Sequence, residues 1–131
     1  MNTHDRDHFD RLLEDVLEEL PPLVHELIEK VPLHVEDYPS QQVLETTGVH
    51  DRRCLCGLYT GVPLTERSVM QSGMLPDVVT IYREGILSAA MGPDGRIATA
   101  ELRRQIRITI LHELAHHHGL DEDELRRLGY G

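Results

Sequence analysis

The stretch that decides the fold is residues 107–122, RITILHELAHHHGLDE. Apolar residues recur in it, and in the residues just before it, at the three- and four-residue spacing of an amphipathic helix. We therefore predict a helix that begins near Thr99 and ends at Gly119, because glycine commonly terminates a helix. The residues expected to form its buried face are Leu102, Ile106, Thr109, Ile110 and Leu114.

The same helix carries the pattern H-E-x-x-H at His112, Glu113 and His116. The two histidines are one turn apart, about 40° around the axis and about 6 Å along it, so both imidazoles can bind one ion. Glu113 is turned by about 100°, which places its carboxylate beside the ion. There it can take a proton from a zinc-activated water and pass it to the leaving group. The spacing predicts His112 and His116 as metal ligands and Glu113 as the catalytic base.

A third metal ligand is predicted at Glu122. A catalytic zinc ion takes three protein ligands and keeps one position open. Gly119 follows His116 by three residues and can turn the chain through a left-handed conformation. Glu122 follows by three more, which gives the spacing H-E-x-x-H-x-x-G-x-x-E. This is the metzincin pattern with a carboxylate in place of the third histidine, and it indicates zinc as the cofactor.

Parts of this stretch also have an ordinary structural interpretation. The imidazoles of His117 and His118, away from the His112 face, would be favourable at the negative end of the helix dipole. Asp121 can cap a short last helix, with a glutamate three residues later completing a capping box. Glu122 would then be a first-turn acid of that helix, with or without zinc.

The rest of the sequence predicts an α+β fold in one domain, residues 1–131. Amphipathic helices are expected over residues 9–20 and 22–31, separated at Pro21. Strands are expected over residues 33–39, over residues 55–60 before a turn at Gly61, and at Val78–Tyr82. Residues 39–53 are polar without a clear period and are predicted to form a loop or lid, and residues 92–95 a turn.

Composition excludes several classes of partner. The 131 residues include 23 acidic and 13 basic ones, for a formal charge of −10. That charge argues against nucleic acid or an anionic membrane surface, since both require a basic footprint. No apolar run approaches the ~18 residues that span a bilayer, and the polar start MNTHDRDHFD is unlike a signal peptide. A cytoplasmic protein is therefore expected.

The two cysteines, Cys54 and Cys56, are separated by one residue. Neighbours that close rarely satisfy disulfide geometry, so both thiols are expected to be reduced and partly buried. With His50 they could supply half of a zinc knuckle, but no second pair completes four ligands. A metal site here is not expected.

Three blocks of the chain resemble the small bacterial zincin-like metallopeptidase family, the minimal zincins: RITILHELAHHHGLDEDELRRLGY, GLYTGVPLTER and LPDVVTIYREGIL. The resemblance covers residues 9–130. It implies N-terminal helices and a small mixed sheet packed around an active-site helix. It also implies His112 and His116 as zinc ligands, Glu113 as the catalytic base and Glu122 as the third ligand.

The chain departs from the family pattern in two places. The family usually has Asp where this chain has Glu122, and the longer side chain makes adjacent Asp121 a second candidate for the third ligand. All four methionines precede the motif, so the Met-turn of true metzincins is missing. The first departure concerns the third metal ligand, and the second bears more on proteolysis than on metal binding.

Two functions of different classes follow. The first is a zinc-dependent peptidase for short or unfolded peptides, which would lie antiparallel to an exposed strand edge, with Val78–Tyr82 the expected edge. Tyr59 or Tyr82 could stabilise the oxyanion of that reaction. The second is a non-catalytic metal-binding or protein-interaction protein with a vestigial zincin site. No fourth protein ligand is evident, which favours the enzyme.

Overall fold

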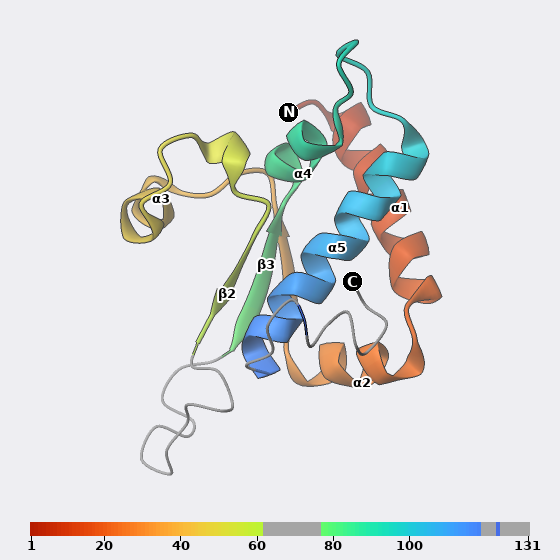
Figure 1. The fold of residues 1–131 in the computed structure, drawn as a ribbon, viewed down its shortest axis with the longest axis vertical. Helices are drawn as coiled ribbons and strands as arrows, with labels where there is room; N and C mark the ends of the chain where they lie inside the picture. Colours follow the sequence, from red (N-terminus) through yellow and green to blue (C-terminus); the bar gives the residue numbers. More distant parts are fainter. Residues whose placement is uncertain (62–76, 119–122, 124–131) are drawn as a thin grey trace.

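The computed structural model describes residues 1–61, 77–118 and 123. In this part of the chain the order of elements is α1 (Thr3–Glu19), α2 (Pro22–Lys30), β1 (Leu33–Glu36), α3 (Gln41–Thr47), the 3₁₀ helix η1 (Arg52–Cys54), β2 (Gly57–Thr60), β3 (Val78–Tyr82), α4 (Arg83–Ala90) and α5 (Thr99–His118). Helices pack against one small mixed sheet (Figure 1), so the predicted α+β class is confirmed. The predicted last helix, beginning at Asp121, lies outside the described residues.

Local signals explain where the first helices begin and end. The Asn2 side chain caps α1 by accepting a hydrogen bond from the Asp5 backbone N–H at 2.8 Å. Pro22 opens α2, where its missing N–H costs nothing. The two predicted N-terminal helices and the strand after them are confirmed, although that strand ends at Glu36 rather than near residue 39.

The sheet places β3 in the centre, in the order β1-β3-β2. β1 pairs with β3 in parallel, with Val35 opposite Ile81, and β2 pairs with β3 in antiparallel fashion, with Gly57 opposite Ile81. The prediction that Val78–Tyr82 is the exposed edge was therefore wrong. Its sequence, VVTIY, lacks the polar alternation of an edge strand and is buried over four of its five residues, as is typical of a central strand.

Two α-helices and one 3₁₀ helix were not expected from the sequence. Residues 39–53, predicted to be a loop or lid, contain α3 and η1. α3 has no buried residue, so no apolar periodicity shows it; the Ser40 side chain caps its start and Gly48, with φ of 75°, ends it. α4 follows β3 without a linker, and its eight residues are too few for a clear period.

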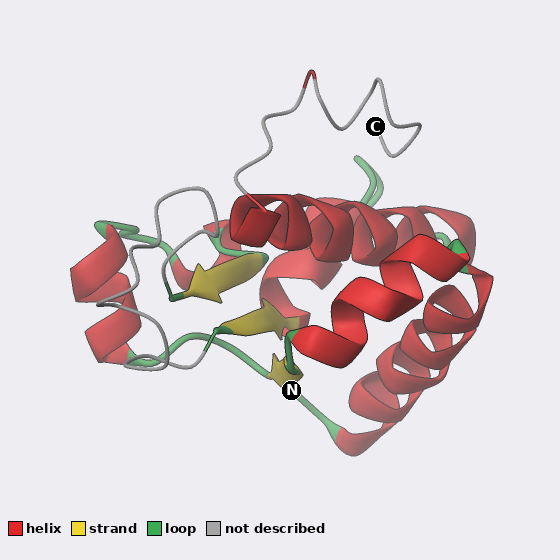
Figure 2. Ribbon diagram, turned by 90° about the horizontal axis from the view of Figure 1, so that it is seen from below, coloured by secondary structure: helices red, strands yellow, loops and turns green. Residues whose placement is uncertain are grey.

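Helix α5 is the centre of the packing, because it contacts α1, α4, β2 and β3. Its predicted buried face is confirmed, with all five residues 7% exposed or less. Figures 1 and 2 show α5 running beside both α1 and the sheet, while α3 projects away from this body. The core joins apolar residues of α1, β3 and α5: Phe9, Leu12, Leu13, Val16, Val79, Ile81, Leu102, Ile106, Ile110 and Leu114.

An ion-pair network ties α1 to the ends of β1 and β3. The Arg83 side chain is 12% exposed; its Nε donates to Asp10 Oδ1 at 2.9 Å and its Nη1 to Asp37 Oδ1 at 3.0 Å. Arg6 adds two hydrogen bonds to Asp37, the shorter at 2.6 Å. The Glu84 backbone N–H also donates to the Asp37 carbonyl, at 2.9 Å. Asp37 thus joins three segments that are distant in sequence.

Within the described ranges, no helix combines the length and the hydropathy that crossing a bilayer requires.

Candidate metal and catalytic site

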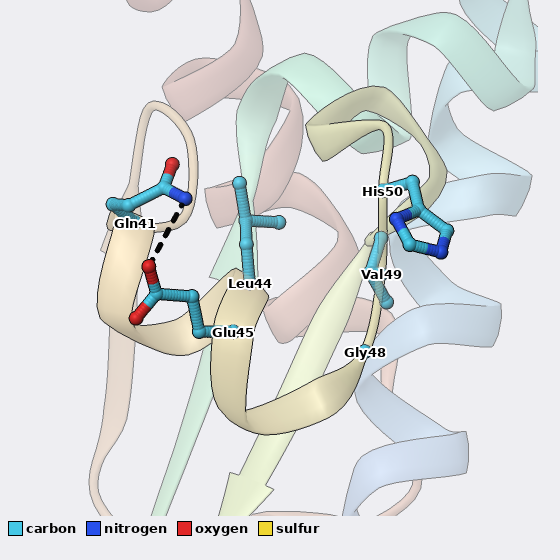
Figure 3. A pocket seen from close by; sticks show the side chains of 6 residues that line it. All are labelled: Gln41, Leu44, Glu45, Gly48, Val49 and His50. Atoms are coloured by element: carbon cyan, nitrogen blue, oxygen red, sulfur yellow. Dashed lines mark hydrogen bonds between the residues drawn. The ribbon is translucent and has the colours of Figure 1, made fainter.

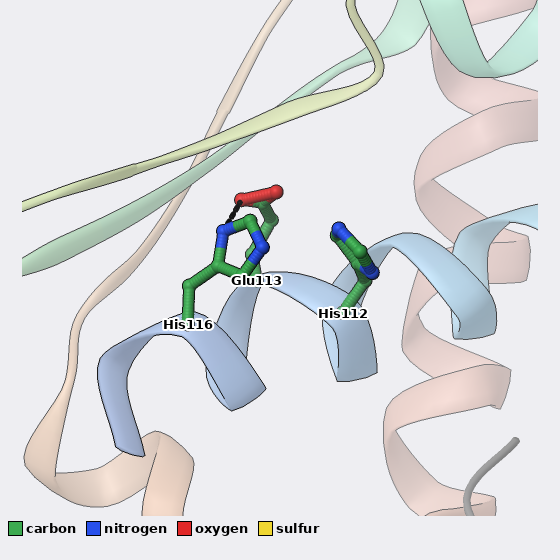
Figure 4. A group of neighbouring side chains, drawn as sticks. All are labelled: His112, Glu113 and His116. Carbon is green, nitrogen blue, oxygen red and sulfur yellow. Dashed lines mark ion pairs between the residues drawn. The ribbon is translucent and has the colours of Figure 1, made fainter. Parts of the chain in front are cut away.

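Three side chains of α5 converge beside β2: those of His112, Glu113 and His116 (Figure 4). One ligand atom from each can be chosen so that all lie within 4.8 Å of one another. Among the residues that the structure describes, no other group of three or more His, Cys, Asp or Glu side chains comes together in this way. The helical spacing in the sequence is therefore sufficient to assemble these three groups.

The three side chains differ in their exposure to solvent. His116 is exposed and His112 is half-buried, whereas Glu113 is only 6% exposed. The imidazole centroids are 4.5 Å apart, with the ring planes at 63° to each other. The two imidazoles are thus accessible to an ion from solution, and the carboxylate lies behind them, against the sheet.

The environment of Glu113 suits a proton acceptor. Its Oε2 atom is buried and has no hydrogen-bond partner among the described residues; the Nδ1 atom of His116 lies 3.6 Å away. The Tyr59 backbone N–H donates a hydrogen bond to the carboxylate. Burial raises the pKa of Glu113, and this effect exceeds the opposing effects of His112 and of the Tyr59 N–H. A carboxylate of raised pKa is a better general base than an exposed one.

The donor set fits a zinc ion. Two imidazoles provide the nitrogen ligands that zinc prefers, and the adjacent carboxylate can act beside the ion. The buried Oε2 of Glu113 is an orphan acceptor in the described structure, and a water held by an ion at the imidazoles would give it a hydrogen-bond donor. A third ligand from Glu122 or Asp121 lies outside the described residues, as do the side chains of His117 and His118.

The two tyrosines proposed for the oxyanion lie in different positions. Tyr82 is only 2% exposed, so its hydroxyl is closed to a substrate. The Tyr59 hydroxyl donates to Asp77 at 3.1 Å. What sequence reasoning missed is the Tyr59 backbone N–H, which reaches Glu113. The signal that could have found it is Gly57, because a glycine inside a strand often marks a close backbone approach.

The remaining sequence candidates do not form a second site. Cys54 and Cys56 are free thiols, the first exposed and the second half-buried. His50, imagined as their metal-binding partner, instead lines a shallow hollow between α3 and the following turn (Figure 3). The polar contact shown there joins Gln41 to Glu45 at 3.4 Å, and both side chains are exposed. This hollow therefore offers no buried reactive group comparable to Glu113.

Comparison with known proteins identifies the family of the chain. The chain matches the family described as zincin-like metallopeptidase over residues 28–131. The matched range begins in α2 and includes the sheet and all of α5. No curated protein matches the chain.

Proposed function

Because the chain belongs to the zincin-like metallopeptidase family, we propose that it is a zinc-dependent hydrolase of peptide bonds. In this proposal His112, His116 and Glu122 hold the metal and Glu113 is the general base. The observation that carries it is the Glu113 carboxylate, which is buried, lacks a partner for Oε2 among the described residues and lies within 4.8 Å of both imidazoles. A carboxylate with only a structural role would ordinarily be paired or exposed.

The role of each residue in the proposed reaction follows from its exposure to solvent. A zinc ion, when bound, supplies a Lewis acid that polarises the peptide carbonyl and lowers the pKa of water. Glu113 takes the proton of the attacking water and delivers it to the amine that leaves. The Tyr59 N–H holds the carboxylate in place during these transfers. The buried position of Glu113 limits competing water, which strengthens both proton transfers.

The peptide substrate would lie along β2 rather than β3. Among the described strands β2 is an edge of the sheet, and it contacts α5 directly. An extended peptide can add to such an edge through main-chain hydrogen bonds, which recognise backbone rather than sequence. This favours short or unfolded peptides as substrates, because a folded chain does not offer an extended segment.

The test is the variant Glu113→Gln. The amide keeps the size of the carboxylate but cannot accept a proton, so hydrolysis of an internally quenched peptide library should fall by about 10²-fold or more. Zinc content, measured by elemental analysis, should stay at the wild-type level. Glu26→Gln, a change at an exposed position of α2, is the matched control and should leave the rate unchanged. Undiminished hydrolysis by the zinc-loaded Glu113→Gln protein would refute the mechanism.

A zinc-loaded wild-type protein that cleaves no member of the library would favour the second function, a non-catalytic metal-binding or protein-interaction protein. In that case Glu113→Gln would change no rate, and the buried carboxylate would be a remnant of an ancestral site.

A further inference from the structure

Strand β2 meets α5 most closely at Gly57. A Cβ atom at this position would lie 2.9 Å from Thr109 Cγ2, 3.0 Å from Glu113 Cγ and 3.2 Å from the Thr80 carbonyl oxygen. Thr109 and Glu113 are one turn apart on α5, and the Thr80 carbonyl belongs to β3, so the position is enclosed from two elements. Only a residue without a side chain lets the backbone of β2 come this close to α5.

Residues 55–57 are held just as closely on the side that faces away from α5. The Tyr82 N–H donates to the Cys56 carbonyl at 2.8 Å, and Gly57 pairs with Ile81 of β3. A Cβ atom at Gly85 in α4 would overlap the Leu55 carbonyl. The segment 55–57 is therefore fixed between α4, β3 and α5, and it has no room to move away from Glu113.

This close approach brings a hydrogen-bond donor to the base. Tyr59 is two residues after Gly57 on the same strand, and its N–H donates to the Glu113 carboxylate. Without that donor, the side chain could turn toward His116, whose Nδ1 is 3.6 Å from Oε2. A fixed donor on one oxygen leaves the other directed to the space beside the two imidazoles.

We propose that Gly57 is a positioning residue for Glu113: its missing side chain allows the Tyr59 N–H to hold the carboxylate beside His112 and His116. The effect of Gly57 on catalysis rests on the proposed function, whereas the close contact between Gly57 and Glu113 does not. Alanine at position 57 must displace the Thr109 side chain, the Glu113 side chain or β2, because the Thr80 carbonyl on the third side is backbone and cannot give way. Because β2 is fixed by α4 and β3, the side chains of Thr109 and Glu113 are the parts that yield.

The first experiment measures the contact in the metal-free protein. The probe is the amide resonance of Tyr59 in ¹H–¹⁵N spectra, since an amide proton that donates to a carboxylate is shifted downfield. Glu113→Ala removes the acceptor and defines the position of the unbonded amide. We expect Gly57→Ala to move the resonance most of the way to that position and Gly92→Ala, in the turn before α5, to leave it in place. A Tyr59 resonance unchanged in Gly57→Ala would overturn the proposal.

The second experiment separates positioning from packing. Gly57→Ala should lower kcat for a quenched peptide library by about 10²-fold, as a misplaced catalytic group does, with KM and zinc affinity close to wild type. The added change Thr109→Ser removes the Cγ2 contact but retains the hydroxyl, which donates to the Gln105 carbonyl at 2.8 Å. The double variant should recover thermal stability but not kcat, because the Glu113 contact remains.

Parallel recovery of stability and kcat in the double variant would show that Gly57 serves packing alone and would refute the positioning role. If wild type hydrolyses no peptide, the proposed function fails, and the Tyr59 resonance still decides whether Gly57 places the Glu113 carboxylate.

Discussion

The Nδ1 atom of His116 lies 3.6 Å from Oε2 of Glu113, the one oxygen of that carboxylate without a hydrogen-bond partner among the described residues. The distance is too long for a hydrogen bond but short enough for both atoms to contact one water molecule. His112 lies on the same side, with its ring centroid 4.5 Å from that of His116. Loss of the His116 side chain should therefore affect both metal binding and the surroundings of the Glu113 carboxylate.

The first prediction concerns zinc binding by the two imidazoles. His112→Ala and His116→Ala should each abolish binding at micromolar zinc, because an ion left with one imidazole and one carboxylate loses most of its affinity. Titration calorimetry and elemental analysis of the purified proteins measure this. His25→Ala, at an exposed position of α2, is the control and should bind like wild type. Wild-type zinc content in His116→Ala would disprove the assignment.

The second prediction concerns the third ligand. The spacing after Gly119 favours Glu122, and the neighbouring Asp121 is the alternative. Glu122→Ala should weaken zinc binding much more than Asp121→Ala, since removing one of three ligands leaves the ion with only the two imidazoles. The measurement is competition with a chelating dye of known affinity. The reverse order of affinities would move the ligand to Asp121, and equal, wild-type affinities would exclude both.

The sequence predicted the features that depend on the spacing of residues within one helix or strand. On α5 the apolar face and the H-E-x-x-H spacing are both local properties of one helix, so the buried face and the His112–Glu113–His116 group followed from the residues alone. The run VVTIY predicted strand β3 for the same reason, because β-branched and aromatic residues favour a strand.

Other features depend on contacts between distant segments, which periodicity does not report. The position of β3 in the sheet is set by its pairing with both β1 and β2, and the short helix α4 is fixed by packing on α5. The approach of Gly57 to Glu113 joins residues that are far apart in the sequence. A glycine in a strand could have suggested a close contact, but not which helix makes it.

The third prediction is that the fold persists without metal. The core cluster is formed by apolar residues of α1, α2, β3, α4 and α5, and it includes none of the three site residues. Burial of this cluster is the main stabilising contribution, and zinc adds only its binding energy. Excess chelator should lower the Tm but leave the far-ultraviolet circular dichroism at room temperature unchanged. Unfolding by chelator, as in a zinc finger, would contradict this.

The last prediction concerns acid stability and the ion pairs of Asp37. The hydrogen bond from Arg6, which is the largest effect, and the additional contact with Arg83 hold the pKa of Asp37 below its ordinary value. A carboxyl group whose pKa is lower in the folded than in the unfolded state stabilises the fold above its unfolded pKa. That stabilisation is lost as the pH falls through the folded pKa. Asp37 should therefore contribute fully at neutral pH and progressively less below about pH 4.

The variant Asp37→Asn tests this directly. At pH 7 it should lower the free energy of unfolding in urea by about 1–2 kcal/mol, since Arg6 and Arg83 lose a charged acceptor that is partly exposed. As the pH falls through the lowered pKa of the folded state, the wild-type carboxyl is itself protonated, so the difference between the two proteins should shrink toward zero. Glu29→Gln, at an exposed position of α2, should show no such pH-dependent difference. A stability difference that stays constant from neutral pH to acid would mean that Asp37 acts through the packing of its side chain, not through its charge.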